Sequence, residues 1–342
     1  MNVIKVKRWN ISRAFRASRM GSVAFLVFVF CFWSGLFSVK AEVLPSYETS
    51  PSENCCFVGL SGSYLMDAQG AIDRINAIRY EACEEGVSDP RDSSRKLTLA
   101  DYVPIKWSKD LETIARLRAA EASITIAHSR INGKSIYDIS SNGVNSTGEV
   151  LAAALKDEQV LYGIEVWYRE KENWVNQNLS NETGHYKAMI NPSNTYVGLG
   201  FFKSNDTEWD GNWAGEFCGE TGSLDDSTLA DQEDIIQTLD VKTSLLQYGL
   251  SVENVYIGYE SKAEPELTLT WGDNEISVTY LSGLDISYAS SDSTVASVNA
   301  QGTVTGLKEG ETEISLLLDG ETVATETVKV TKEKVLCPYP NI

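Results

Sequence analysis

The sequence predicts a mixed α+β domain followed by a small all-β sandwich. Apolar residues recur at helical spacing up to about residue 174, and the pattern then changes to an alternation with period two. Beyond about residue 244, short β segments are separated by turns rich in Gly, Asn and Asp. Helices followed by strands are typical of helices packed on an antiparallel sheet, and strands with turns alone are typical of a sandwich.

Three helices are expected in the first domain. The first begins at Asp67, the second follows an N-cap at Ser108, and the third covers residues 158–174. Their apolar faces consist of Ile72, Ile75, Ile78 and Ala82, of Leu111, Ile114, Ala115 and Ala122, and of Leu161, Ile164, Trp167 and Tyr168. Polar loops are expected at 84–101 and 132–148.

The strands fall into two groups. In the first domain they are expected at 197–202 and 213–218. In the second they are expected at 266–271, 275–280, 295–298, 303–304, 313–317 and 325–330. The chain is thereby divided into a signal peptide at 1–41, an extended N-terminal arm at 42–66, the first domain at 67–219, an acidic linker at 220–243, the second domain at 244–332 and a tail at 333–342.

The first 41 residues are typical of an export signal. Lys and Arg residues precede an apolar run at 23–37, and small residues stand at the expected cleavage position, Ala41. The run is shorter than the ~20 residues that a membrane-spanning helix needs. We therefore expect a secreted or cell-surface-associated protein without a stable membrane span after cleavage.

Net charge restricts the partners. The chain has 29 basic and 48 acidic residues, a net charge of −19. Seven of the basic residues lie in the signal, so its removal leaves 22 against 48, or −26. Such a surface repels nucleic acid and anionic lipid headgroups, and no nucleic-acid partner is expected.

Five cysteines remain beyond the signal, namely Cys55, Cys56, Cys83, Cys218 and Cys337. Export makes disulfides an expectation, although the sequence leaves their pairing open and the odd number leaves one thiol over. The adjacent pair is not expected to bond to itself, because the geometry would be strained.

The chain contains only two histidines, His128 and His185. Two glutamates, Glu149 and Glu170, lie between them in the sequence. Imidazole changes charge near neutral pH and is the commonest protein ligand for metals. Two imidazoles and a carboxylate form a ligand set that suits zinc with an open fourth position. These residues are therefore the candidate functional site.

The motifs around these residues resemble a known family. They are Trp107-Ser108-x-x-Leu111-x-x-x-Ala115, Ala119-x-Glu121, His128-Ser129-Arg130, Gly148-Glu149, Trp167-Tyr168-x-Glu170 and Gly184-His185-Tyr186. In this order, over about residues 68–219, they are similar to the SCP domain of the CAP superfamily, which includes cysteine-rich secretory proteins, antigen 5 and pathogenesis-related proteins. The resemblance implies a three-layer α-β-α sandwich.

By the same resemblance, His128, Glu149, Glu170 and His185 line a central ligand-binding cleft, and the two histidines are the ligands of a divalent metal in some members. The sequence also departs from the family pattern. Ser129 and Ile131 stand in place of Thr and Pro, Val150 in place of Asn, and Lys187-Ala188 in place of Thr-Gln. Because groups that would orient the four side chains have changed, the resemblance does not carry a family activity over to this chain.

Residues 289–298 and 302–306 resemble bacterial immunoglobulin-like group 2 domains, which occur in surface and secreted bacterial proteins. The combination indicates a bacterial exoprotein. Its preferred function is extracellular binding of a lipid, peptide or glycan in the cleft, with zinc or another divalent cation as a candidate cofactor. The alternatives are a metal-dependent hydrolase of peptide or cell-wall material, with Glu149 or Glu170 as the catalytic base, and a structural adhesin. Whether the protein is an enzyme is left open.

Overall fold

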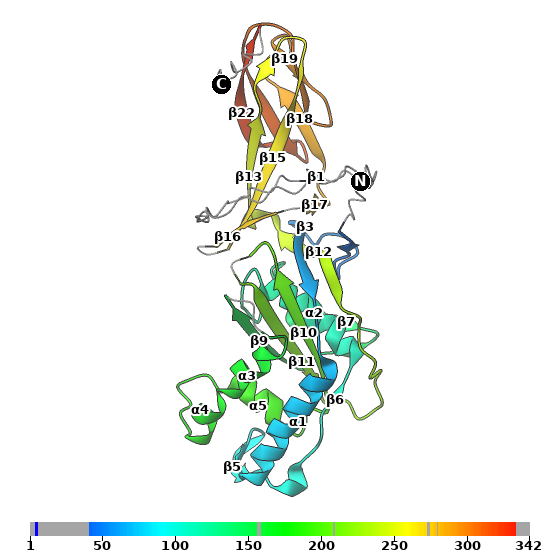
Figure 1. Cartoon of the computed structure of the whole chain (residues 1–342), viewed down its shortest axis with the longest axis vertical. Helices are drawn as coiled ribbons and strands as arrows, with labels where there is room; N and C mark the ends of the chain where they lie inside the picture. Colours follow the sequence, from blue (N-terminus) through cyan, green and yellow to red (C-terminus); the bar gives the residue numbers. More distant parts are fainter. Residues whose placement is uncertain are drawn as a thin grey trace, which may run out of the picture.

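The computed structural model describes residues 4–5, 41–155, 159–207, 209–271, 274–278 and 280–332. They form two parts that follow one another along the long axis of the molecule (Figure 1). Nearly all of the predicted signal peptide, the tail at 333–342 and Cys337 lie outside these ranges. Among the described residues, no helix is both long and apolar enough to cross a membrane.

A nine-stranded sheet forms the centre of the first part, in the order β1-β17-β3-β10-β11-β9. In addition, β12 pairs with β2 and β3, and β6 pairs with β10. The strands are β1 (Ile4–Lys5), β2 (Val43–Leu44), β3 (Cys55–Tyr64), β6 (Lys106–Trp107), β9 (Gly148–Ala154), β10 (Tyr196–Ser204), β11 (Gly211–Cys218), β12 (Gln232–Lys242) and β17 (Tyr280–Ser282). The neighbouring pairs along the main order are all antiparallel.

Helices cover both faces of this sheet. They are α1 (Ala68–Glu84), α2 (Lys109–Ala122), α3 (Tyr162–Tyr168), α4 (Lys171–Val175) and α5 (Gly184–Ile190). Helix α2 packs on one face, and α1, α3 and α5 lie on the other (Figure 1). The predicted three-layer α-β-α sandwich is therefore confirmed.

Both predicted helix starts are confirmed by their caps. Asp67 Oδ1 accepts a hydrogen bond from the backbone N–H of Gly70 at 2.9 Å, and Ser108 Oγ accepts one from Leu111 at 3.4 Å. Each bond satisfies a donor that the first helical turn leaves unpaired. Asp110 and Glu112 in the first turn of α2 add favourable charge at the positive end of the helix dipole.

The period-two pattern of β10 decides how closely α2 approaches. Val197, Leu199 and Phe201 face the layer of α1, α3 and α5, while Gly198 and Gly200 face α2. A Cβ atom at Gly198 would lie 2.0 Å from the Glu112 nitrogen, and one at Gly200 would lie 2.4 Å from the Ala115 carbonyl. The two glycines therefore allow the backbone of α2 to rest directly on the sheet.

We expect Gly200→Ala to lower the free energy of unfolding by about 1–3 kcal/mol, because α2 must move away from the sheet to admit the methyl group. Urea unfolding followed by circular dichroism measures the effect. Gly148→Ala is the control, since its Cβ would meet nothing nearer than Phe217 Cβ at 4.0 Å. Equal stability of the two variants would contradict the close-packing argument.

Three sequence predictions are corrected here. The arm at 42–66 includes β3, a buried strand paired on both sides, and the linker at 220–243 includes β12, its neighbour. Small residues in β3 look like a loop in isolation, but they are buried by long-range pairing. The single helix at 158–174 is instead α3 and α4, which are separated at Arg169 and Glu170.

The predicted loops also contain short regular elements. Residues 84–101 hold β4 (Ser88–Asp89), β5 (Asp92–Lys96) and the 3₁₀ turn η1 (Leu99–Asp101). Residues 132–148 hold η2 (Ile136–Asp138), β7 (Ser140–Ser141), β8 (Val144–Asn145) and the first residue of β9. Cys55, Cys56, Cys83 and Cys218 are buried free thiols, so the expected disulfides do not form among the described cysteines.

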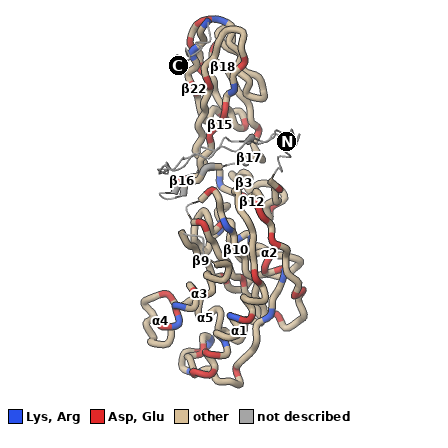
Figure 2. The backbone as a smooth tube through the Cα atoms, in the orientation of Figure 1, with Lys and Arg blue, Asp and Glu red and all other residues tan. Residues whose placement is uncertain are grey.

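The second part is the predicted β-sandwich. One sheet has the order β13-β15-β20-β19 with β16 on β15, and the other has the order β14-β22-β21-β18. Its elements are η3 (Thr243–Leu245), β13 (Leu246–Val252), β14 (Val255–Tyr256), β15 (Glu260–Trp271), β16 (Asn274–Ser277), β18 (Ile286–Ser290), β19 (Ala296–Val298), β20 (Thr303–Gly306), β21 (Gly310–Leu318) and β22 (Glu321–Thr331). Acidic residues occur in both parts of the chain (Figure 2).

Strand β17 joins the two parts. It lies within the predicted second domain, yet it pairs with β3 of the first, with Leu281 opposite Val58. Both residues are fully buried and belong to one apolar cluster, which runs from the α2 face into the sandwich and includes Leu267. The two parts are therefore connected by a shared sheet and a shared core.

Candidate functional site

The four predicted site residues gather around the start of β9, the last strand of the sheet. His128 follows α2, Glu149 lies on β9, Glu170 lies between α3 and α4, and His185 lies on α5. The two helical layers meet around this strand, so side chains from opposite faces of the sheet come together. We call these four residues the His/Glu site.

His128 and Glu149 form the first pair. Nδ1 of His128 lies 2.7 Å from Glu149 Oε1. The Glu149 side chain is buried, while that of His128 is 57% exposed. The hydrogen bond that His128 donates to Glu149 raises the pKa of His128 above its usual value. Burial opposes the ionisation of Glu149, but its bonds with His128 and Arg118 hold its pKa below the usual value.

His185 and Glu170 form the second pair. Nδ1 of His185 lies 2.6 Å from Glu170 Oε1, and Glu170 Oε2 accepts the backbone N–H groups of His185 at 2.8 Å and Tyr186 at 3.1 Å. Burial opposes ionisation of this carboxylate as well, but these bonds lower its pKa below the usual value. The break between α3 and α4 places Glu170 where it can reach the first turn of α5.

The two imidazole rings face the same region, with their centroids 6.3 Å apart. Both rings use Nδ1 for the bond to a glutamate, and neither Nε2 has a hydrogen-bond partner among the described residues. Glu182, which the sequence analysis missed, forms a potential cation-binding group with Glu170 and His185, with ligand atoms within 4.8 Å of one another. Its position three residues before His185 was the only available signal.

A buried row of alternating charges supports Glu149. Arg118 donates to Glu149 Oε2 at 2.5 Å, to Glu121, and to the backbone carbonyl of Ala127 at 2.7 Å. Arg130 continues the row by donating to Glu121 Oε1 at 2.8 Å. The motif residues Glu121 and Arg130 thus position the site without touching either histidine.

Glu216 is a further acidic residue that the sequence analysis missed. It lies on β11 directly opposite Glu149 and is 1% exposed. Its Oε1 has no hydrogen-bond partner among the described residues. Burial, and then the charge of Glu149, raise the pKa of Glu216 well above its usual value. This raised pKa favours the protonated form of Glu216 beside the carboxylate of Glu149.

The fold of the first part is that of a CAP domain. The family model of CAP, the cysteine-rich secretory protein family, matches residues 72–216, and that of the bacterial Ig-like domain (group 2) matches residues 277–331. Residues 72–216 are therefore similar to a CAP domain, and residues 277–331 to a bacterial Ig-like domain (group 2).

Several solved structures are similar to part of the chain. BmVAL-1 is 14% identical with a TM-score of 0.34, covering 50% of this chain and 81% of that one. Schistosoma mansoni venom allergen-like protein 4 is 13% identical with a TM-score of 0.30, covering 47% and 96%. A C-terminal fragment of intimin, in complex with the intimin-binding domain of its translocated receptor, is 17% identical with a TM-score of 0.18, covering 39% and 50%. No curated protein matches the sequence.

Proposed function

We propose that this CAP-domain protein acts outside the cell as a binding protein, and that His128 and His185 hold a divalent cation as part of its binding site. One observation carries the proposal: each imidazole is fixed through Nδ1 by its own buried carboxylate, at 2.7 and 2.6 Å. Histidines that bind metals through one nitrogen usually donate the other N–H to a carboxylate or carbonyl. The ring separation of 6.3 Å is consistent with two ligands around one ion.

The donor set fits zinc. Zinc is bound by histidine nitrogens and carboxylate oxygens, with one position left for water or a ligand. Glu182 supplies an exposed carboxylate beside His185 and Glu170. A bound cation would attract an anionic or carbonyl oxygen of an extracellular lipid, peptide or glycan. Glu149 and Glu170 orient the rings, and Arg118 holds Glu149 and the His128 loop in place.

Hydrolysis is the weaker alternative. A general base must reach a proton of the substrate or of the attacking water. Glu170 already accepts bonds from a ring nitrogen and two backbone N–H groups, and Glu149 accepts bonds from His128 and Arg118. Both carboxylates are buried, which suits positioning of the imidazole rings better than catalysis.

An extracellular location is supported by the signal-like N-terminus and by the bacterial Ig-like domain. The Ig-like domain would serve as a spacer or an adhesive module.

We expect the full chain, stripped of metal, to bind one zinc ion at pH 7.5, and the His128→Ala/His185→Ala variant to bind at least tenfold more weakly. Isothermal titration calorimetry measures both. Because a proton competes for the imidazole and the pKa of His128 is raised, the affinity should increase between pH 6 and pH 8.

Two glutamine variants distinguish zinc binding at this site from nonspecific attraction of zinc to exposed acidic residues. Glu182→Gln should weaken zinc binding, whereas Glu172→Gln, an equally exposed neighbour on α4, should leave it unchanged. Absence of binding by the wild type, or equal binding by the double-histidine variant, would rule out the cation-dependent proposal. The His/Glu pairs would then be a hydrogen-bonded brace between the layers.

A further inference from the structure

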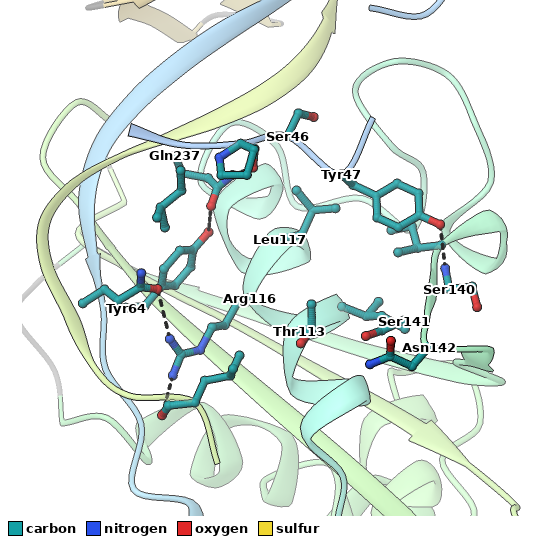
Figure 3. A pocket seen from close by; sticks show the side chains of 16 residues that line it. Ser46, Tyr47, Tyr64, Thr113, Arg116, Leu117, Ser140, Ser141, Asn142 and Gln237 are labelled. Carbon is teal, nitrogen blue, oxygen red and sulfur yellow. Dashed lines mark hydrogen bonds between the residues drawn. The ribbon is translucent and has the colours of Figure 1, made fainter. Parts of the chain in front are cut away.

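A cavity of about 470 Å³ lies beside α2, and none of its lining residues belongs to the His/Glu site. It is lined by α2, β12, the segment 139–142 that contains β7, and the N-terminal segment 44–47, which passes over it (Figure 3). This volume is within the range of small-molecule sites, roughly 300–1,000 Å³. Its aliphatic lining consists of the side chains of Leu44, Ile114, Leu117, Ile139 and Leu229.

The charged group at one end is fully compensated. Arg116 donates to Glu112 Oε1 at 2.7 and 3.1 Å and to the carbonyls of Leu229 and Ala230 at 3.1 and 2.9 Å. Its last N–H faces Gln232 Oε1 at 3.5 Å. Because a guanidinium has five N–H donors, none is left for an anionic ligand.

The neighbouring amide at this end is occupied as well. Gln237 accepts the Tyr64 hydroxyl at 3.0 Å and donates to the carbonyls of Pro45 and Thr238 at 3.1 and 2.8 Å. Figure 3 shows Tyr64, Gln237 and Arg116 gathered on one side of the cavity, away from Tyr47. This end therefore offers an apolar wall whose polar atoms are already paired.

The opposite end keeps a hydroxyl donor. The Tyr47 hydroxyl accepts the backbone N–H of Ser140 at 3.0 Å, and its own proton has no acceptor among the described residues. Ser141 and Asn142 both donate to Asp110 Oδ1 at 2.8 Å, so a carboxylate stands behind this end. The Tyr47 hydroxyl can donate a hydrogen bond to a neutral ligand oxygen, whereas the Asp110 carboxylate would repel a negatively charged group.

We propose that this cavity binds a neutral, mainly aliphatic molecule with a hydroxyl group at the end near Tyr47. The aliphatic lining supplies the affinity through burial of apolar surface. An ionised head group would lose its hydration without gaining a free opposite charge, because Arg116 is already paired with Glu112 and Asp110 already accepts two hydrogen bonds. This site is independent of the cation site, because it shares no residue with it.

The test compares three eight-carbon probes on the full chain, namely 1-octanol, octanoate and octylammonium. Each is titrated in competition with the neutral fluorescent probe N-phenyl-1-naphthylamine at pH 7.5. We expect octanol to compete at concentrations at least tenfold lower than either charged analogue. The His128→Ala/His185→Ala variant should behave as wild type, so failure of the cation proposal would not affect this result. Absence of displacement by octanol, or equal displacement by a charged analogue, would overturn the proposal.

Three variants locate the site. Thr113→Trp fills the cavity from an exposed position of α2 and should weaken octanol binding at least tenfold, whereas Lys109→Trp, one turn earlier and outside the lining, should not. Tyr47→Phe keeps the ring and removes the hydroxyl, and should weaken octanol three- to tenfold without changing the affinity for the fluorescent probe. Equal octanol binding by the two tryptophan variants, or wild-type octanol binding by Tyr47→Phe, would overturn the assignment.

Discussion

Replacing Arg118 by methionine is expected to lower the free energy of unfolding by about 3–5 kcal/mol. Arg118 is 1% exposed, and its guanidinium lies between the buried carboxylates of Glu121 and Glu149. The substitution keeps the aliphatic volume but leaves two buried negative charges without the cation that they share. Urea unfolding of the full chain at pH 7 measures the loss.

The control is Arg95→Met. Arg95 also binds two carboxylates, Asp89 and Asp101, but it is 46% exposed. We expect a much smaller loss than for Arg118→Met, because water screens exposed ion pairs and Arg91 remains bound to Asp89. Equal losses for the two arginine variants would contradict the burial argument.

A double variant tests the origin of the loss. If the unpaired charge of Glu149 is responsible, Arg118→Met combined with Glu149→Gln should be more stable than Arg118→Met alone.

Arg118→Met should also weaken cation binding at the His/Glu site, since Arg118 donates to the carbonyl of Ala127 next to His128. Zinc affinity of Arg118→Met should fall roughly 10- to 100-fold, as for other residues that orient metal ligands.

The sequence predicted those features that local patterns encode. The caps at Asp67 and Ser108, the alternation in β10 and the turn-separated strands beyond residue 244 depend on neighbours within a few positions, and all are confirmed. The meeting of the four His/Glu residues was predicted from ordered motifs and a family resemblance. Periodicity alone could not have placed His128 near His185, because they approach from opposite faces of the sheet.

The features that the sequence analysis missed depend on long-range register. Strand β3 has a Gly- and Ser-containing sequence and becomes a central strand only because β12, β10 and β17 pair with it. Glu216 looks like one more polar residue on a strand until β11 pairs with β9 and places it opposite Glu149. A shift of the register by one residue would turn its side chain to the other face.

Replacing Glu216 by glutamine is expected to remove a pH-dependent loss of stability. Burial and the charge of Glu149 raise the pKa of Glu216 well above its usual value, so the folded chain keeps a proton that the unfolded chain releases above about pH 4.3. Between about pH 4.3 and the raised pKa of Glu216, the folded state binds more protons than the unfolded state. The free energy of unfolding therefore falls as pH rises in this range, by up to about 1.4 kcal/mol per pH unit. Gln cannot ionise and retains a hydrogen-bond donor toward Glu149.

The measurement is urea unfolding of both proteins at pH 5, 6.5 and 8. The stability of Glu216→Gln relative to wild type should be greater at pH 8 than at pH 5. The raised pKa of His128 gives a slope of the same sign above about pH 6.5 in both proteins, so it cancels in the difference. Glu149 and Glu170 have lowered pKa values, so their contribution to stability is constant above the ordinary glutamate pKa. It decreases only as pH falls below that value, outside this series.

Glu313→Gln is the matched control, because Glu313 is an exposed strand residue on β21. It should follow the wild type at every pH. Parallel pH dependence of Glu216→Gln and wild type would mean that Glu216 does not hold a proton in the folded chain. Glu149 would then face a second negative charge across the strand pair, and Arg118 would have to compensate three carboxylates instead of two.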